Sequence, residues 1–202
     1  MKRKIGITFM ISGLVLLVFA AALLVYNNFE SKRAEEKADV VVDSLMGEIE
    51  RNRLTEIETD PFEKEMKVVE IDGYGYIGYI YIPMLNLELP VMDKWDYNRL
   101  KISPCRYYGS SKTDNLVIAA HNYRSHFKYL GQLKPGDTIM FSDMEGNNHT
   151  YSVSVVEILK PTDVEKVKDT GDDLILYTCV YSGADRIVVR CDKIVEKNSQ
   201  NY

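Results

Sequence analysis

The chain has 202 residues, a hydrophobic content of 46% and a formal net charge of −5 at neutral pH. Its pI near 5.3 shows no global basic character, so the sequence predicts no nucleic-acid partner. Three cysteines are too few and too scattered for a disulfide framework or a zinc site with paired ligands. We therefore expect no metal, no cofactor and at least one unpaired thiol.

An apolar segment without any charged side chain covers residues 5–26, which suffices for a membrane helix of roughly 20 residues. Basic residues 2–4 precede it, whereas the residues after it carry both signs of charge, so the tip 1–4 is expected in the cytoplasm. The rest of the chain is then predicted to lie outside the cell. A cleaved signal peptide is the alternative, because the alanines at 20–22 are small, but the segment exceeds the roughly 7–15 residues of a signal core.

Residues 27–71 are predicted to form a helical stalk that ends in an irregular segment. The part from 31 to 53 is charged and carries apolar residues at near-helical spacing, namely Val40, Val41, Leu45, Met46 and Ile49. Proline disfavours helical conformation in the residue before it, so Asp60-Pro61 indicates a break. The stalk is interpreted as a spacer between the membrane and the domain, or as a helix that packs on the domain.

From Tyr74 the sequence changes to short alternating runs rich in Val, Ile and Tyr, separated by Gly and Pro. This predicts a mainly β fold, a β-barrel domain over 72–197, with a polar tail at 198–202. The expected strands are 75–82, 87–91, 115–120, 138–141, 149–159, 173–178 and 186–195. Short helices are expected around 95–99, 126–130 and 163–167.

Cys179 follows the strand-like run 173–178, and two arginines occur on the next predicted strand. A thiol there can act as a nucleophile if a cation or proton acceptor lies nearby, although a buried core thiol is the ordinary alternative. In a strand, Arg186 and Arg190 share one face but lie about 13 Å apart, so only one can touch a given acyl group. Cys191 is expected in the core, and a bridge between Cys105 and Cys191 stays open.

His121 follows the apolar run 116–120, where a strand gives way to a loop, which is a usual place for functional side chains. His126 and His149 have no motif around them and are interpreted as structural. Histidine, cysteine and arginine together would supply proton transfer, attack and charge stabilisation for covalent acyl transfer.

The frames around these residues resemble those of the sortases, membrane-anchored cysteine transpeptidases of Gram-positive bacteria. Residues 175–179, Ile-Leu-Tyr-Thr-Cys, resemble the sortase signature Thr-Leu-x-Thr-Cys except at Ile175, and Ala120-His121 stands where sortases commonly have Gly-His. The run 186–190 resembles the sortase segment in which the first arginine is catalytic. The resemblance extends over about 72–194, in the same order along the chain.

This resemblance implies a closed sortase-like barrel in which Cys179, His121 and Arg186 are catalytic. Cys179 would cleave a Leu-Pro-x-Thr-Gly-like C-terminal sorting motif of secreted proteins through a thioester. The acyl group would pass to an amine of a cell-wall precursor, such as the lipid II cross-bridge, or of a pilin lysine. Thr178 and Arg190 are further candidates for substrate contact, and residues 161–171 stand where sortases form a substrate-selecting loop. Some sortases bind calcium through surface carboxylates, but no ligand set is evident in this sequence.

Two features bear on the subclass. Asp60-Pro61-Phe62 resembles the lid of pilin-polymerising, class C sortases, in which Asp60 would pair with Arg186 and Phe62 would cover Cys179. The polar C-terminus, without a second membrane helix, favours a wall-anchoring or otherwise specialised enzyme instead. Two other classes remain: an extracellular cysteine peptidase or hydrolase, although papain-like enzymes have Cys before His, and a non-catalytic membrane-tethered β-barrel binding module.

Overall fold

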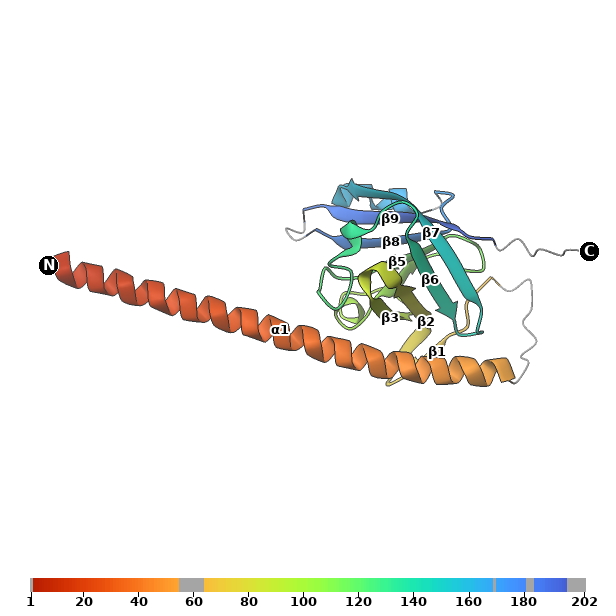
Figure 1. The fold of residues 1–202 in the computed structure, drawn as a ribbon, viewed down its shortest axis with the longest axis horizontal. Helices are drawn as coiled ribbons and strands as arrows, with labels where there is room; N and C mark the ends of the chain where they lie inside the picture. Colours follow the sequence, from red (N-terminus) through yellow and green to blue (C-terminus); the bar gives the residue numbers. More distant parts are fainter. Residues whose placement is uncertain (1, 55–63, 169, 181–183, 196–202) are drawn as a thin grey trace, which may run out of the picture.

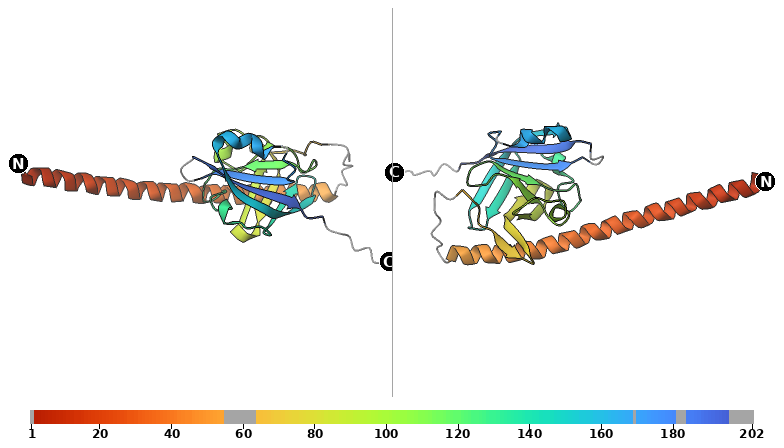
Figure 2. Two further views of the ribbon diagram at one scale, coloured as in Figure 1. Left: turned by 90° about the horizontal axis from the view of Figure 1, so that it is seen from above. Right: turned by 180° about the vertical axis from the view of Figure 1, so that it is seen from behind.

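The computed structural model describes residues 2–54, 64–168, 170–180 and 184–195, and it consists of one long helix beside a β-barrel. Helix α1 runs from Lys2 to Leu54 without interruption. Its C-terminal half lies along one side of the barrel, whereas its N-terminal half extends beyond the barrel (Figures 1 and 2). The predicted membrane segment and the predicted stalk therefore belong to a single helix.

The two halves of α1 have different surfaces. The window Phe9–Tyr26 has a mean hydropathy of 2.6 and none of it is buried, so it is long and apolar enough to cross a membrane. The other half buries a stripe at spacings of four, three and four residues, which is the apolar face of a helix packed on one side. This stripe consists of Ala38, Val42, Leu45 and Ile49. Of the expected apolar set, Leu45 and Ile49 are buried and Val41 and Met46 are half-buried, whereas Val40 is 66% exposed.

Nine strands in the described part of the chain form one sheet, in the order β1-β2-β3-β4-β5-β8-β9-β7-β6. The additional pairing of β2 with β6 closes the eight strands from β2 to β9 into a barrel, and β1 continues from β2 at the edge. The strands are β1 (Val69–Ile71), β2 (Tyr74–Ile82), β3 (Leu87–Met92), β4 (Cys105–Tyr108), β5 (Leu116–Ala119), β6 (Thr138–Asp143), β7 (Asn148–Leu159), β8 (Leu174–Cys179) and β9 (Arg186–Lys193).

Closure of the barrel depends on a close approach at Gly78. This residue adopts a φ of +147° at an irregularity in β2, and a Cβ atom there would lie 2.0 Å from the carbonyl oxygen of Ser142 on β6. Only glycine has both the conformational freedom and the missing side chain that this contact requires. The glycine inside this predicted strand thus marks the place where β2 meets β6 and the barrel closes.

The barrel has apolar clusters on both faces of its wall. The inner core fills the barrel and includes Ile80, Ile118, Leu176 and Val189. The outer core covers the external face of several strands, includes Val117, Tyr177 and Val188, and also takes up Leu45 and Ile49 of α1. Strands β5 and β8 are buried on both faces, which is why they read as continuous apolar runs in the sequence.

The direction of α1 relative to the barrel follows from contacts at both ends. We call the end at which β5, β7 and β8 finish the Cys179 end, and the end that holds the β6–β7 turn the turn end. The Asn52 amide and the Arg53 guanidinium donate hydrogen bonds of 2.8 and 3.0 Å to the carbonyls of Met144 and Gly146 in that turn. The helix therefore finishes at the turn end and approaches the barrel from the Cys179 end.

Several short elements differ from the sequence expectation. Strands β1 and β4 are additional, because runs of three or four residues carry too little alternation to stand out. The expected short helices are 3-10 turns: η2 is Arg99–Lys101, η3 is Leu130–Gln132 and η4 is Pro161–Val167, and a further turn, η1, covers Pro83–Leu85.

Docking of α1 can be tested with Leu45→Ala. Leu45 is fully buried between helix and barrel, so its truncation is expected to lower the free energy of unfolding by about 2–5 kcal/mol. Val40→Ala on the exposed face is the matched control and should change it by less than about 0.5 kcal/mol. Chemical denaturation of the full chain in detergent measures both, and equal values for the two variants would contradict the packing described above.

Candidate active site

Cys179 and His121 are brought to the same end of the barrel by the pairing of β5 with β8. These strands are parallel, with Ala119 opposite Tyr177, so their carboxyl ends lie at one edge. The amide of Ala120 donates to the carbonyl of Tyr177 at 3.1 Å, and the Thr178 hydroxyl donates to the carbonyl of Ala120 at 2.9 Å. The hydrogen bond between Thr178 and Ala120 is thus made by the two residues that directly precede Cys179 and His121.

Thr178 is 1% exposed, and its hydroxyl hydrogen bond lies inside the wall of the barrel. Successive residues of a strand point to opposite faces, so an inward Thr178 places Cys179 on the outer face. This arrangement gives Thr178 a positioning role between the two strand ends.

Arg186 is the direct partner of Cys179 in the antiparallel pairing of β8 with β9. Side chains of directly opposite residues share one face, with Cβ atoms about 4.5–5.5 Å apart. Arg186 is half-buried, and one of its guanidinium nitrogens donates to the carbonyl of Asp185 at 3.1 Å. A cation therefore stands next to the thiol on the outer face of the barrel.

The ring of His121 is held by a neighbouring aromatic side chain. Tyr123 stacks on it with ring centroids 4.8 Å apart and an interplanar angle of 29°. Within the described residues, the buried Nε2 of His121 has no hydrogen-bond partner. Burial, and secondarily the positive charge of Lys101, lower the pKa of His121. The ring therefore loses its proton at a lower pH than a free imidazole does, and the neutral ring can accept a proton from a reacting group.

The other two histidines have structural surroundings. His126 is 2% exposed, and burial lowers its pKa to about 4, with a smaller contribution from His121. The Nε2 atom of His149 lies 3.0 Å from a carboxylate oxygen of Asp143, on the hairpin of β6 and β7 at the turn end. Neither ring lies beside Cys179 in the strand pairing.

Arg190 holds the segment that covers the outer face next to Arg186. Its guanidinium lies 2.6 Å from Glu157, 2.6 Å from Asp172 and 3.0 Å from the carbonyl of Lys166. These contacts tie β7 and β9 to the stretch between η4 and β8. Turn η4 then forms one wall of a small hollow lined by Leu159, Lys160, Asp163, Val167, Tyr177, Arg186 and Val188. Arg186, the strand partner of Cys179, belongs to the lining of this hollow.

The two other thiols are buried and unreactive by environment. Cys105 and Cys191 are both 0% exposed, whereas Cys179 is partly exposed, and all three are free. Burial raises the pKa of Cys105 to about 12 and raises that of Cys191 as well. The bridge between Cys105 and Cys191 that the sequence left open is not formed.

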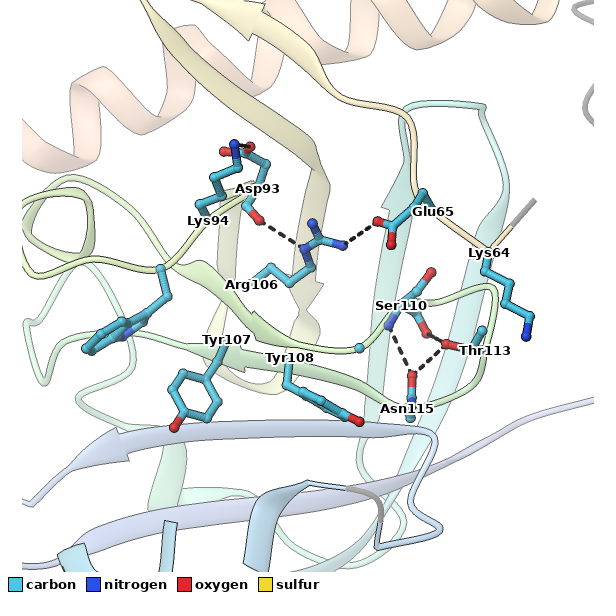
Figure 3. A pocket seen from close by; sticks show the side chains of 12 residues that line it. Lys64, Glu65, Asp93, Lys94, Arg106, Tyr107, Tyr108, Ser110, Thr113 and Asn115 are labelled. Atoms are coloured by element: carbon cyan, nitrogen blue, oxygen red, sulfur yellow. Dashed lines mark hydrogen bonds and ion pairs between the residues drawn. The ribbon is translucent and has the colours of Figure 1, made fainter. Parts of the chain in front are cut away.

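A second hollow lies along β4 and is shown in Figure 3. Arg106 bridges the carbonyl of Asp93 at 2.9 Å and the carboxylate of Glu65 at 3.3 Å, so these polar groups of the lining are engaged with each other. Tyr107 points away from them toward β8, where its ring lies 5.4 Å from that of Tyr177. Tyr107 therefore packs on the outer face of the strand that ends at Cys179.

Sequence reasoning missed Lys101, whose charge acts on His121, and Tyr123, which stacks on His121. It also missed Tyr107, which packs on Tyr177 of β8. Their residue types carry no motif, and only Tyr123 has a sequence signal, its position two residues after His121. Asp60 and Phe62, the lid candidates, lie outside the described residues. No group of three or more His, Cys, Asp or Glu side chains that could hold a metal occurs in the part of the chain that the structure describes.

Thiol reactivity tests this arrangement. Cys179 is expected to react with a maleimide on the folded chain at least about a hundredfold faster than Cys105 or Cys191, because only Cys179 is accessible. Mass spectrometry after proteolysis identifies the modified residue, and Cys179→Ala labelled in denaturant serves as the control in which the two buried thiols react. Labelling of a buried thiol at the same rate in the folded chain would contradict the site.

Comparisons with known proteins agree on one family. The sortase domain family model matches residues 80–194. The chain is 31% identical to sortase A of Bacillus anthracis over 144 residues, which cover 66% of this chain and 67% of that protein.

Solved structures show the same relation. Sortase C1 of Streptococcus agalactiae is 30% identical, with a TM-score of 0.54, over 63% of this chain and 72% of that one. The sortase D5 transpeptidase of Clostridium perfringens, at 17% identity, shares the fold with a TM-score of 0.58 over 81% of this chain and 99% of that one. The matched segment contains His121, Cys179 and Arg186. The chain belongs to the sortase family of cysteine transpeptidases.

Proposed function

We propose that Cys179 is the nucleophile of a two-step acyl transfer. Its sulfur attacks the carbonyl carbon of a peptide bond in the substrate, the carbon–nitrogen bond breaks, and a thioester remains on the enzyme. The observation that carries this proposal is the direct pairing of the partly exposed Cys179 with Arg186, at the edge where His121 follows β5.

His121 is the acid and base of this proposal. As an imidazole it takes the proton of the Cys179 thiol, and as the resulting imidazolium it gives that proton to the amine that leaves in the first step. As an imidazole again, it takes a proton from the amine that attacks the thioester and returns it to the Cys179 sulfur. The half-buried ring with its unpartnered Nε2, fixed by the stack on Tyr123, supports this role. The thiol is regenerated when the second amine has formed the new amide bond.

Arg186 is proposed to stabilise the negative charge that develops on the substrate oxygen, or to bind the substrate carbonyl. Arg190 is engaged with Glu157 and Asp172, so we assign it the positioning of the segment between η4 and β8. That segment, together with the hollow under η4, is proposed to select the residues of the substrate before the cleaved bond.

The substrate is proposed to be a Leu-Pro-x-Thr-Gly-like sorting motif near the C-terminus of a secreted protein. Membership of the sortase family and the identity of 31% to a sortase A support this substrate class. The acceptor would be an amine of a cell-wall precursor or of a pilin lysine. One structural relative, a sortase C of Streptococcus pneumoniae, is described in terms of pilin substrate specificity, at 23% identity.

The apolar window Phe9–Tyr26 of α1 is proposed to anchor the chain in the cell membrane in a single pass. Basic residues 2–4 favour a cytoplasmic N-terminus, which leaves the barrel outside the cell. Secreted substrates and cell-wall amines are both accessible there.

The lid formed by Asp60 and Phe62 stays a prediction. Described residues near it on either side contact the barrel, Arg53 at the carbonyl of Gly146 and Glu65 at the guanidinium of Arg106 on β4. Faster acyl transfer by a variant with Asp60→Ala and Phe62→Ala would support it.

Acyl transfer can be measured by mass spectrometry with a pooled set of sorting-motif peptides and amine acceptors. We expect a thioester on Cys179, amide products that require the amine, and a loss of rate of at least about a thousandfold in Cys179→Ala. Cys105→Ala is the control, because its thiol is buried away from the site and the variant should keep its activity. Equal amounts of hydrolysed product with and without amine would indicate a peptidase instead.

The charge of Lys101 provides a test of the role of His121. Lys101 lowers the pKa of His121, so Lys101→Gln is expected to raise this pKa and to move the corresponding limb of the pH profile of kcat/KM to higher pH. Lys64→Gln, at the turn end beside the β4–β5 connection, removes the same charge and should leave the profile unchanged. Identical profiles for both variants would contradict the electrostatic contact with His121.

A further inference from the structure

Helix α1 fixes which end of the barrel faces the membrane. It is continuous from the apolar window Phe9–Tyr26 to its contacts with Met144 and Gly146 at the turn end. Because the helix approaches from the Cys179 end, that end is nearer to the apolar window, and Figure 1 shows the apolar half of α1 extending beyond the barrel on one side only.

A groove between α1 and the barrel shows how near the Cys179 end lies to the apolar window of the helix. Its volume is about 720 Å³, and it is lined by Asn28 and Lys32 of α1 together with Arg124 and Tyr129 of the loop that follows His121. Asn28 and Lys32 stand two and six residues beyond Tyr26, which corresponds to about 3 and 9 Å along a helix axis. The loop after His121 therefore lies at the level where a membrane-spanning α1 would leave the headgroups.

This loop, residues 122–129, has the side chains of a surface that contacts lipid headgroups. Its middle part, residues 125–127, is buried and anchors the loop on the barrel. Tyr123 and Tyr129 are 43% and 37% exposed, and Arg124 and Lys128 are exposed as well. Tyrosine is enriched at membrane interfaces, where its ring lies among the headgroups, and basic side chains favour anionic lipids.

The distribution of charges around the loop also favours a contact with lipid headgroups. Lys32 lies on the side of the groove nearer to the apolar window, whereas the carboxylates of Glu35, Asp39 and Glu88 line its deeper part. Lys128 lies 5.6 Å from the ring centroid of Tyr129, so the two form one cationic and aromatic unit. The basic side chains thus lie on the loop and near the apolar window, whereas the acidic ones lie farther along α1 and on β3.

We propose that the Cys179 end of the barrel faces the bilayer and that the loop 122–129 contacts the anionic phospholipid headgroups of the membrane that holds α1. The contact would orient the active site toward the membrane surface, and Tyr123 would connect it directly to the catalytic His121. This inference rests on the proposed membrane anchoring by α1, and it adds an interaction surface that the reaction itself does not require.

Fluorescence quenching in vesicles tests the contact on the full chain. The single tryptophan is first replaced by Trp95→Phe, and a probe is introduced by Tyr129→Trp in the loop or by Lys64→Trp at the turn end. With spin-labelled phospholipids in vesicles that contain phosphatidylglycerol, the probe at 129 is expected to be quenched at least about twofold more than the probe at 64. Equal quenching of the two probes would overturn the proposal.

Charge reversal separates the lipid contact from mere proximity. Each basic residue near an anionic surface favours contact by about fivefold, so Arg124→Glu with Lys128→Glu should reduce quenching of the probe at 129 to the level seen in phosphatidylcholine vesicles. Lys64→Glu with Lys67→Glu, the same charge change on the segment before β1 at the turn end, should leave it unchanged. If quenching of the probe at 129 changes neither with the charge reversal nor with the charge of the lipid, the contact with anionic headgroups is overturned.

Flotation of the vesicles is measured in parallel. Failure of the chain to float with them would overturn the anchoring by α1 and this inference with it. If the chain floats but the probe at 129 is not quenched, the anchoring stands and only the orientation is wrong. Acyl transfer to a soluble amine is a separate readout, because Arg124 and Lys128 take no part in the proposed chemistry.

Discussion

The site depends on the parallel pairing of β5 with β8 and on the hydrogen bond that ends it. Parallel strands finish at the same edge, so this pairing alone brings residues 58 positions apart, His121 and Cys179, to one place. The hydrogen bond from the Thr178 hydroxyl to the carbonyl of Ala120 then fixes the residue before Cys179 and the residue before His121. Because the bond is buried, water cannot compete for it, and the strand ends cannot separate without leaving the carbonyl of Ala120 unsatisfied.

The closed barrel explains why the reactive residues lie outside rather than inside. The interior is filled by the inner core, so a substrate can reach only the external face of β5, β8 and β9. That face would be an exposed apolar surface if the outer core did not cover it. Val167 of η4 covers part of it, whereas Leu45 and Ile49 of α1 cover the neighbouring strands β2 and β3. The uncovered remainder, around Arg186, is where the chemistry is placed.

The sequence predicted the parts of the fold that have strong local signals. The apolar segment, the helical stalk and the barrel were recognised, and the family was identified from Leu176-Tyr177-Thr178-Cys179 and from the order of His121, Cys179 and Arg186. Of the apolar residues expected on the stalk only Val40 lies on the exposed side, because hydropathy alone does not tell a buried valine from an exposed one. Strands β1 and β4 were missed because pairing with a neighbour, rather than their own composition, makes them strands.

The environment of His121 was beyond the reach of sequence patterns for a topological reason. A barrel with parallel pairs needs long crossovers, and the crossover between β3 and β4 carries Lys101 to the Cys179 end, where its charge acts on His121. The loop that leaves β5 turns back at once, because the amide of Phe127 donates to the carbonyl of His121 at 3.2 Å, and so Tyr123 comes to stack on the ring. Strands supply the reacting groups, whereas crossovers and loops set their charge and orientation. The same loop lies beside α1, so the segment that fixes the catalytic histidine is also the one nearest to the membrane end of the helix.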